Sequence, residues 1–156
     1  MSLVNLSYVC SHLQNCSRAL TPMTSIQYTK VHLAVVLGLY RHGLLGSVHL
    51  GDGRGPDMTP TQIENSNVAS RRLWVTMKYK DSVPVLKSGS LVSTPKKTFT
   101  LTKPEVHALI HGMSVKHIPP IVPGEVMFLR TDKGVLECRE AVAIGRGGQA
   151  LCRFKS

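Results

Sequence analysis

This 156-residue sequence lacks the hallmarks of several protein classes. Aromatic residues make up only 5% of it, with a single Trp, so a core must rest on Val, Leu, Ile and Met. No run of about 18 apolar residues occurs, which excludes a membrane-spanning helix. The four Cys form no CxxC pairs and nothing resembles a secretory signal, which favours reduced, buried thiols.

Acidic residues are also scarce. Nineteen Lys and Arg stand against nine Asp and Glu, a formal net charge of +10 with His neutral. This excess favours a polyanionic partner, because each neutralised phosphate releases condensed counterions. An anionic membrane surface is the competing polyanion. The hydrophobic fraction of 42% and a mean hydropathy of +0.02 still predict a folded core, in one domain or two small ones.

The acids that do occur are unevenly placed. None precedes Asp52, whereas Arg18, Lys30 and Arg41 do. An acid-free, Ser-rich start with sparse basic residues resembles a mitochondrial targeting sequence. The alternative is an RNA-facing domain that simply avoids acids.

Periodicity and capping signals predict alternating helices and strands in the first half. Apolar spacing gives a helix over 3–19, and Thr29 is the expected N-cap of a second helix that starts at Lys30 and ends at Gly43. The expected strands are 25–28, 46–50, 72–79 and an edge segment at 83–87, with a loop insertion at 51–70.

The second half is expected to begin with a linker at 88–97. Thr102 should cap a helix that runs to about His111. A short helix is expected at 137–144, and strands at 99–101, 126–129, 135–136 and 149–154, with a hairpin-type turn at 131–134.

Three features invite an enzymatic interpretation, and each is weak. His107, His111 and His117 could bind zinc, but the first two lack the intervening Glu of a protease motif. The Gly-rich segment 145–148 closes a helix and opens a strand, the reverse of a dinucleotide loop, so a tight turn with close backbone contact is the better explanation. No nucleophile lies in a recognisable elbow. We expect no catalytic residue, metal site or cofactor.

A basic tract carries a stronger signal. Between Arg71 and Lys103 there are eight Lys and Arg against one acid, Asp81. Within it, the segment 93–97 combines hydroxyl groups, a rigid turn and two cations, which suits contacts to a sugar-phosphate backbone.

The last third of the chain resembles a known family. The segment 130–136 reads Arg-Thr-Asp-Lys-Gly-Val-Leu, and after a short helix Gly145-x-Gly147-Gly148-Gln149 leads to Cys152. This resembles the Ser-Thr-Ser-Lys-Gly-Val-Met and Gly-x-Gly-Gly-Glu pattern of the S-eight family of small-subunit ribosomal proteins. Other stretches are similar in the same order: 12–15, 29–31, 43–45, 77–79 and 92–95.

The resemblance implies an α+β fold of two small α/β units. An N-terminal α-β-α-β-β unit at 1–87 would pack on a C-terminal, mostly β unit with short helices at 88–156. This chain looks longer than the family pattern at about 51–70, and the family's first helix begins almost at Met1, which favours retention of the N-terminus.

It also implies an rRNA site, carried over by matching motif positions. The turn after the strand at 126–129 and the Gly-Gly-Gln segment should touch an rRNA helix, with the 93–97 loop beside them and the start of the second helix as another contact. The expected RNA-binding residues are Thr29, Lys30, Ser93, Pro95, Lys96, Lys97, Arg130, Thr131, Asp132, Lys133, Gly147, Gly148 and Gln149.

Departures from the pattern indicate a diverged rRNA partner. Arg130 and Asp132 replace serines, Gln149 replaces Glu, and Thr98 and Thr100 replace an Arg and an aromatic residue. Asp132 facing a phosphate would be repelled, so it should point away or meet a different RNA.

These expectations make the chain a structural protein of the mitochondrial small ribosomal subunit, bound to the central domain of small-subunit rRNA and to neighbouring ribosomal proteins. Neither a membrane nor a small-molecule substrate is expected as a partner. The alternatives are an RNA-binding protein outside the ribosome, a bacterial or plastid-type ribosomal protein, and, as an enzyme, a zinc hydrolase.

Overall fold

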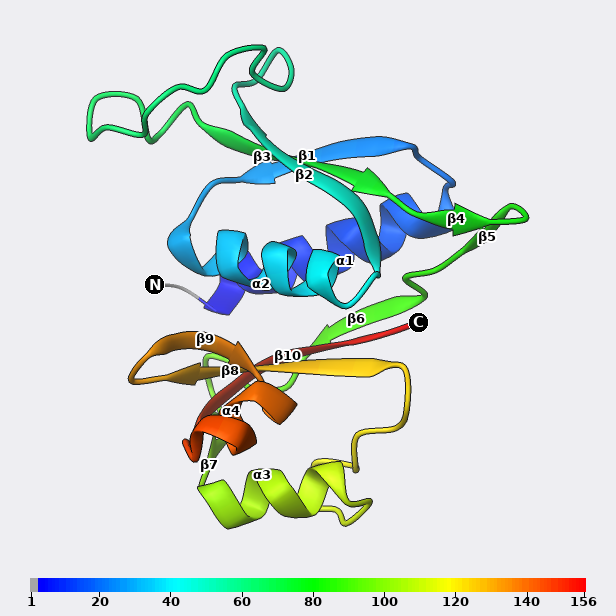
Figure 1. Cartoon of the computed structure of the whole chain (residues 1–156), viewed down its shortest axis with the longest axis vertical. Helices are drawn as coiled ribbons and strands as arrows, with labels where there is room; N and C mark the ends of the chain where they lie inside the picture. The colour runs from blue at the N-terminus through cyan, green and yellow to red at the C-terminus, as the bar shows by residue number, and fades with distance from the viewer. Residues whose placement is uncertain (1–2) are drawn as a thin grey trace. The chain divides into compact units, whose positions relative to one another are not determined.

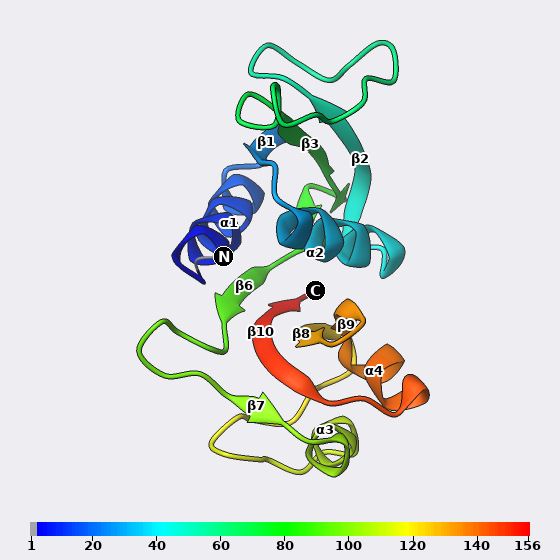
Figure 2. The same ribbon diagram turned by 90° about the vertical axis from the view of Figure 1, so that its left-hand side faces the viewer.

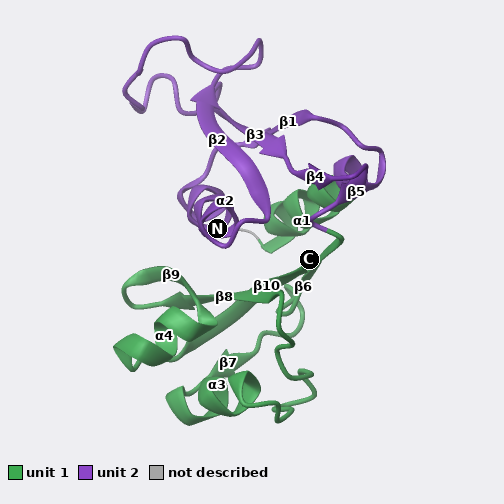
Figure 3. Cartoon of the chain, turned by 45° about the vertical axis from the view of Figure 1, so that its right-hand side comes forward, with its two compact units in different colours: residues 1–14, 87–156 green, residues 15–86 purple. Residues whose placement is uncertain are grey.

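The computed structural model describes residues 3–156, which form two compact units. Unit 2 comprises residues 15–86, and unit 1 comprises residues 3–14 together with 87–156 (Figure 3). The predicted division of the chain into 1–87 and 88–156 stays a prediction. Residues 3–14 group with the C-terminal segment 87–156 and not with residues 15–86.

Side-chain contacts of the first helix with the C-terminal segment explain this grouping. Helix α1 (Leu3–Arg18) crosses the division between the units. The side chain of Gln14 accepts a hydrogen bond from the N–H of Gly89 at 3.1 Å, and the thiol of Cys10 is hydrogen-bonded to that of Cys152. These side-chain contacts join segments far apart in the sequence, so periodicity along α1 could not reveal them.

Unit 2 is a three-stranded antiparallel sheet with a helix on one face (Figure 1). Thr29 caps the helix as predicted, since its hydroxyl accepts from the N–H of His32 at 3.0 Å. The order of strands in the sheet is β1-β3-β2, and a short hairpin follows it. The elements are β1 (Met23–Gln27), α2 (Lys30–Arg41), β2 (Leu45–Gly51), β3 (Arg72–Met77), β4 (Tyr79–Lys80) and β5 (Val83–Pro84).

The predicted loop insertion between β2 and β3 contains no helix or named strand over residues 52–71. Its base is fixed by the buried guanidinium of Arg71, which is paired with Asp57. The indole N–H of Trp74 donates to the carbonyl of Asp52 at 2.9 Å. The loop is therefore anchored to the sheet at its start and at its end.

Unit 1 is built on a sheet with strand order β6-β10-β8-β9, and β7 pairs with the start of β10 (Figure 2). The α+β class predicted from the sequence is confirmed. The elements are β6 (Ser88–Leu91), β7 (Thr100–Leu101), α3 (Lys103–Ile110), β8 (Glu125–Thr131), β9 (Gly134–Glu137), α4 (Cys138–Ile144) and β10 (Gly148–Lys155).

The expected edge segment at 83–87 is a strand only over Val83–Pro84, and the predicted start of the linker is wrong. Residues 88–91, expected to start a linker, form strand β6, and Leu91 pairs with Cys152 of β10. The sequence Ser-Gly-Ser-Leu has turn-like composition and no apolar alternation. Its pairing is supplied by a strand more than 50 residues later, which no local signal could indicate.

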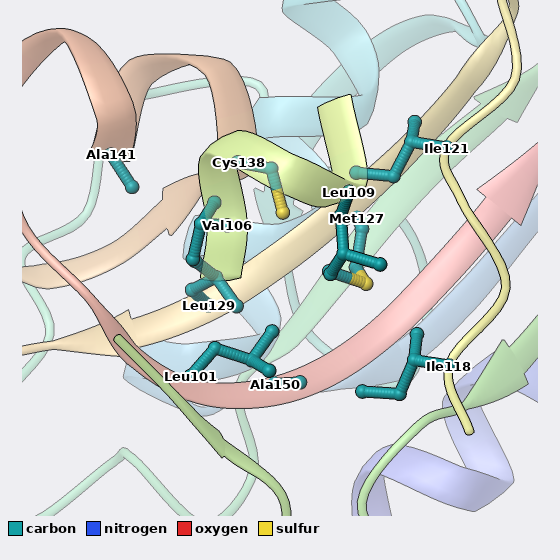
Figure 4. Packing of buried hydrophobic residues seen from close by; sticks show 10 residues of the cluster. All are labelled: Leu101, Val106, Leu109, Ile118, Ile121, Met127, Leu129, Cys138, Ala141 and Ala150. Atoms are coloured by element: carbon teal, nitrogen blue, oxygen red, sulfur yellow. The ribbon is translucent and has the colours of Figure 1, made fainter. Parts of the chain in front are cut away.

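The core of unit 1 lies where α3, α4, β8 and β10 meet (Figure 4). Val106 and Leu109 come from α3, Cys138 and Ala141 from α4, and all four are fully buried. Thr102 caps helix α3 as predicted, and its N–H donates to the carboxylate of Glu105 at 2.7 Å. The cysteines of residues 3–156 form no disulfide. Burial raises the pKa of Cys138 and of Cys152, so both remain uncharged thiols.

A buried ionic cluster fixes the Pro-rich segment 119–123, which cannot form regular structure. Arg153 of β10 is paired with Glu125 of β8 and donates to the carbonyls of Pro119 at 3.1 Å and Pro120 at 3.0 Å. Glu125 also accepts from the N–H of Val122 at 3.0 Å, and its Oε1 atom lies 3.0 Å from the ammonium of Lys155. Burial opposes the charge of Glu125, but these donors together lower its pKa.

We predict that Glu125→Gln lowers the free energy of unfolding by about 3 kcal/mol, because it leaves Arg153 buried without its counter-ion. Glu64→Gln, at an exposed loop position, should change it by less than about 0.5 kcal/mol. Urea unfolding measures both, and equal stabilities would contradict the role of the cluster.

The lowered pKa of Glu125 determines how the free energy of unfolding changes with pH. Glu125 stabilises the fold fully above the pKa of an unfolded Glu, about 4.3, and that contribution is lost as the pH falls through the folded pKa. The stability gap between wild type and Glu125→Gln should therefore narrow in acid.

Candidate nucleic-acid interface

Most of the predicted RNA-binding residues gather around the start of β10 in unit 1. Gln149 is paired with Arg130 of β8 on one side and with Thr100 of β7 on the other. The N–H of Ala150 donates to the carbonyl of Phe99 at 2.8 Å, which joins the segment 93–99 to the same place. Three segments distant in sequence are thus joined there: the end of the 93–99 loop, the end of β8 that leads into the β8–β9 turn, and residues 147–149.

Two glycines make this meeting possible. A Cβ added to Gly147 would lie 2.3 Å from the carbonyl oxygen of Leu101, and one added to Gly148 would lie 2.1 Å from that of Arg130. Both distances are far below van der Waals contact, so a side chain at either position would force the backbones apart. The predicted close backbone approach of the Gly-rich segment is confirmed.

The β8–β9 turn uses its own hydroxyl to hold its shape. The hydroxyl of Thr131 donates to the carbonyl of Gly134 at 2.8 Å and accepts from the N–H of Lys133 at 3.2 Å. Gly134 has a φ of +104°, which favours glycine. Lys133 lies exposed at the tip, so the turn presents a cation on a hydrogen-bonded frame.

Asp132, which replaces a serine of the family pattern, forms an ion pair. Its carboxylate lies 3.2 Å from the guanidinium of Arg146, in the segment that joins α4 to β10. Both side chains are about half exposed, so the pair contributes little to stability. Its consequence is local neutrality, because the negative charge of the turn is matched by a cation beside it.

The 93–97 loop divides into a buried and an exposed part. Ser93 is fully buried and its hydroxyl accepts from the N–H of Phe99 at 2.9 Å, so it holds the loop in place. Thr94 and Lys97 close a turn through backbone bonds of 2.9 and 3.1 Å. Pro95 and Lys96 are exposed, and the ammonium of Lys97 lies 5.1 Å from the ring centre of Phe99.

Two further cations lie at this place and were absent from the predicted site. One is Arg146, and the other is Lys103, whose ammonium would lie 3.3 Å from a Cβ at Gly145. Lys103 belongs to the basic tract seen in the sequence, but only the pairing of β7 with β10 brings it beside the Gly-rich segment. We call the exposed cations Lys96, Lys97, Lys103, Arg130, Lys133 and Arg146, with residues 147–149, the β10 surface.

Thr29 and Lys30 lie in unit 2, at the first turn of α2. The hydroxyl of Thr29 is occupied by its capping bond, whereas Lys30 is exposed. Their contact with RNA stays a prediction, as does each contact predicted for the β10 surface.

The histidines behind the zinc interpretation come only partly together. The Nε2 atoms of His107 and His111 lie 3.0 Å apart on the exposed side of α3. Within residues 3–156, no group of three or more His, Cys, Asp or Glu side chains is placed to hold a metal ion. In the same residues, no helix is long and apolar enough to cross a membrane.

Comparison with known proteins agrees with the resemblance seen in the sequence. A model of the family described as Ribosomal protein S8 matches residues 5–154. Small ribosomal subunit protein uS8m of Neurospora crassa is 38% identical, over 99% of this chain and 100% of that protein. The uS8m protein of Schizosaccharomyces pombe is 36% identical, over 97% and 100%. Small ribosomal subunit protein uS8 of Dictyoglomus thermophilum is 21% identical, over 90% and 88%.

We predict that Gly148→Ala lowers the free energy of unfolding by about 1–3 kcal/mol, since the new methyl group would overlap the carbonyl of Arg130. Gly53→Ala is the matched control, because no atom lies within 4 Å of its added Cβ. Thermal or urea unfolding compares the two. A Gly148→Ala protein as stable as the control would show that the strands can separate at no cost.

Proposed function

This chain belongs to the ribosomal protein S8 family, and from that premise we propose that it is a structural component of the mitochondrial small ribosomal subunit that binds small-subunit rRNA. One observation carries the proposal: the chain matches two uS8m proteins over their entire length. The identity to these proteins is 36–38% over 97–99% of the chain. The uS8 proteins match at 21% over 90% of the chain or at 31–35% over 53–62% of it, a difference that supports the mitochondrial ribosome as its location.

The β10 surface supports RNA as the ligand. It gathers six exposed cations, and its one acid in the turn, Asp132, is neutralised by Arg146. Phosphate contacts supply most of the affinity of such a surface, and rigid backbone turns fix its register on the RNA. We assign the surface to a helix in the central domain of the rRNA, where its binding would support subunit assembly and translation, with other small-subunit proteins as neighbours.

The proposed role is structural and assigns no residue to catalysis. Thr131 and Ser93 hold loops through their hydroxyl groups, and Gly147 and Gly148 allow close strand contact. We assign the phosphate contacts to the exposed cations of the β10 surface. Affinity should therefore depend strongly on salt and only weakly on base identity.

Crosslinking of the protein to RNA in isolated mitochondria, followed by sequencing of the attached RNA, tests the function. We expect one helix in the central domain of the small-subunit rRNA to be enriched. Crosslinks scattered over unrelated RNAs would point to a general RNA-binding protein outside the ribosome, and would reject the proposal.

The turn can be tested by two opposite charge changes. Lys133→Ala should weaken binding to the cognate rRNA fragment and reduce the slope of log affinity against log salt by about 1. Asp132→Asn should tighten binding at low salt, because it releases Arg146, and the gain should vanish at high salt. Lys80→Ala, on the β4–β5 hairpin, is the control for a cation outside the surface. Unchanged affinity in both turn variants would remove the turn from the interface.

A further inference from the structure

The β1-β3-β2 sheet of unit 2 has one face that no helix of its unit covers. Leu73, Val75 and Met77 of β3 are buried on the other face, while Arg72, Trp74 and Thr76 alternate with them. Residues directly opposite across a sheet share a face, so the registers define a grid of nine positions. The grid comprises Met23, Ser25 and Gln27, then Arg72, Trp74 and Thr76, then Ser47, His49 and Gly51.

Trp74 occupies the centre of this grid and is held in place. Its neighbours across the strands are Ser25 on β1 and His49 on β2. The indole N–H donates to the carbonyl of Asp52 at 2.9 Å, and the Cδ1 atom lies 2.6 Å from where a Cβ of Gly51 would stand. The absence of a side chain at Gly51 makes room for the ring and also for the loop, because the carbonyl oxygen of Gly55 lies 2.3 Å from the same point.

The charges on this face favour an anionic ligand. None of the nine grid positions is Asp or Glu, and neither is any residue of β1, β2 or β3. Arg72 is the cation of the grid, oriented by its bonds to the hydroxyl of Ser25 at 2.9 Å and to the Ser25 carbonyl at 3.2 Å. The nearby carboxylate of Asp52 is occupied by the N–H groups of Arg54 and Gly55.

The polarity of the face argues against a protein partner. Hydroxyl and amide groups surround the aromatic ring, with Ser47 donating to Thr76 at 2.7 Å, and Met23 is the one aliphatic side chain longer than a methyl group in the grid. The buried centre of a protein interface is richer in apolar side chains than this. Trp74 is partly exposed on this face, beside Gly51, which the loop covers. A partly exposed aromatic ring on a sheet, among hydroxyl groups and a cation, is the arrangement on which unstacked bases are bound.

We propose that this face is a second RNA site, which binds a single-stranded segment by stacking a base on Trp74 while Arg72 contacts the adjoining phosphate. The proposal extends the proposed function and rests on it for the class of ligand. It uses none of the residues of the β10 surface.

Trp74 is the only Trp of the chain, so its fluorescence reports on this site alone. We expect a 12-nucleotide unstructured RNA, added to the full-length protein, to quench that fluorescence. The quenching should persist in Lys133→Ala, whose lost cation lies on the β10 surface. Fluorescence anisotropy of the labelled RNA gives the affinity independently.

Two variants separate stacking from folding. Trp74→Ala should bind the RNA about 10-fold more weakly, since the base loses its stacking partner, whereas Trp74→Phe should stay within a few-fold of wild type. Circular dichroism of both variants verifies the fold. If Trp74→Ala unfolds, the quenching in the wild-type protein and the affinity of Trp74→Phe still show whether a base stacks on the ring.

Binding of the RNA without quenching would overturn the inference and leave the proposed function standing. A Trp74 signal changed by RNA-free small-subunit proteins but not by RNA would overturn it in favour of a protein interface. Different measurements would reject the proposed function: the crosslinking would give no small-subunit rRNA, and the protein would show no affinity for the rRNA fragment.

Discussion

The close approach of three backbones at the start of β10 is the constraint on which the β10 surface depends. Gly147 and Gly148 place this strand so near the carbonyls of Leu101 and Arg130 that no side chain fits between them. The β8–β9 turn and the loop before β7 are thereby brought to one place. Without this contact the cations of the two segments would lie on separate loops, and their charges would not add at one phosphate backbone.

Around this backbone contact, some polar side chains hold the loops of the β10 surface in shape, and others supply its charge. The hydroxyl groups of Ser93 and Thr131 are bonded to the backbone of their own loops. The ammonium of Lys133 extends from a turn that its neighbours keep rigid. A rigid frame loses less conformational entropy when it binds, so the same charges give a tighter complex.

The pair of Asp132 and Arg146 accounts for the most puzzling departure from the family pattern. An acid at the tip of an RNA-binding turn would repel phosphate, but here a neighbouring guanidinium matches its charge. The buried cluster of Glu125 and Arg153 has a different effect, since it fixes the Pro-rich segment against the sheet. One exposed pair therefore modulates the charge of the surface, whereas the buried pair maintains the fold.

The sequence by itself determined the features that neighbouring residues specify: the cap at Thr29, the helix that begins after Thr102, the turn at 131–134 and the excess of cations. Only the tertiary structure decided that 88–91 is a strand, that Ser93 is buried and that Arg146 neutralises Asp132. The physical reason is the separation along the chain over which each interaction acts. Capping, turn formation and periodicity act within a few residues, whereas strand pairing, burial and ion pairing depend on partners that the fold brings from elsewhere in the chain.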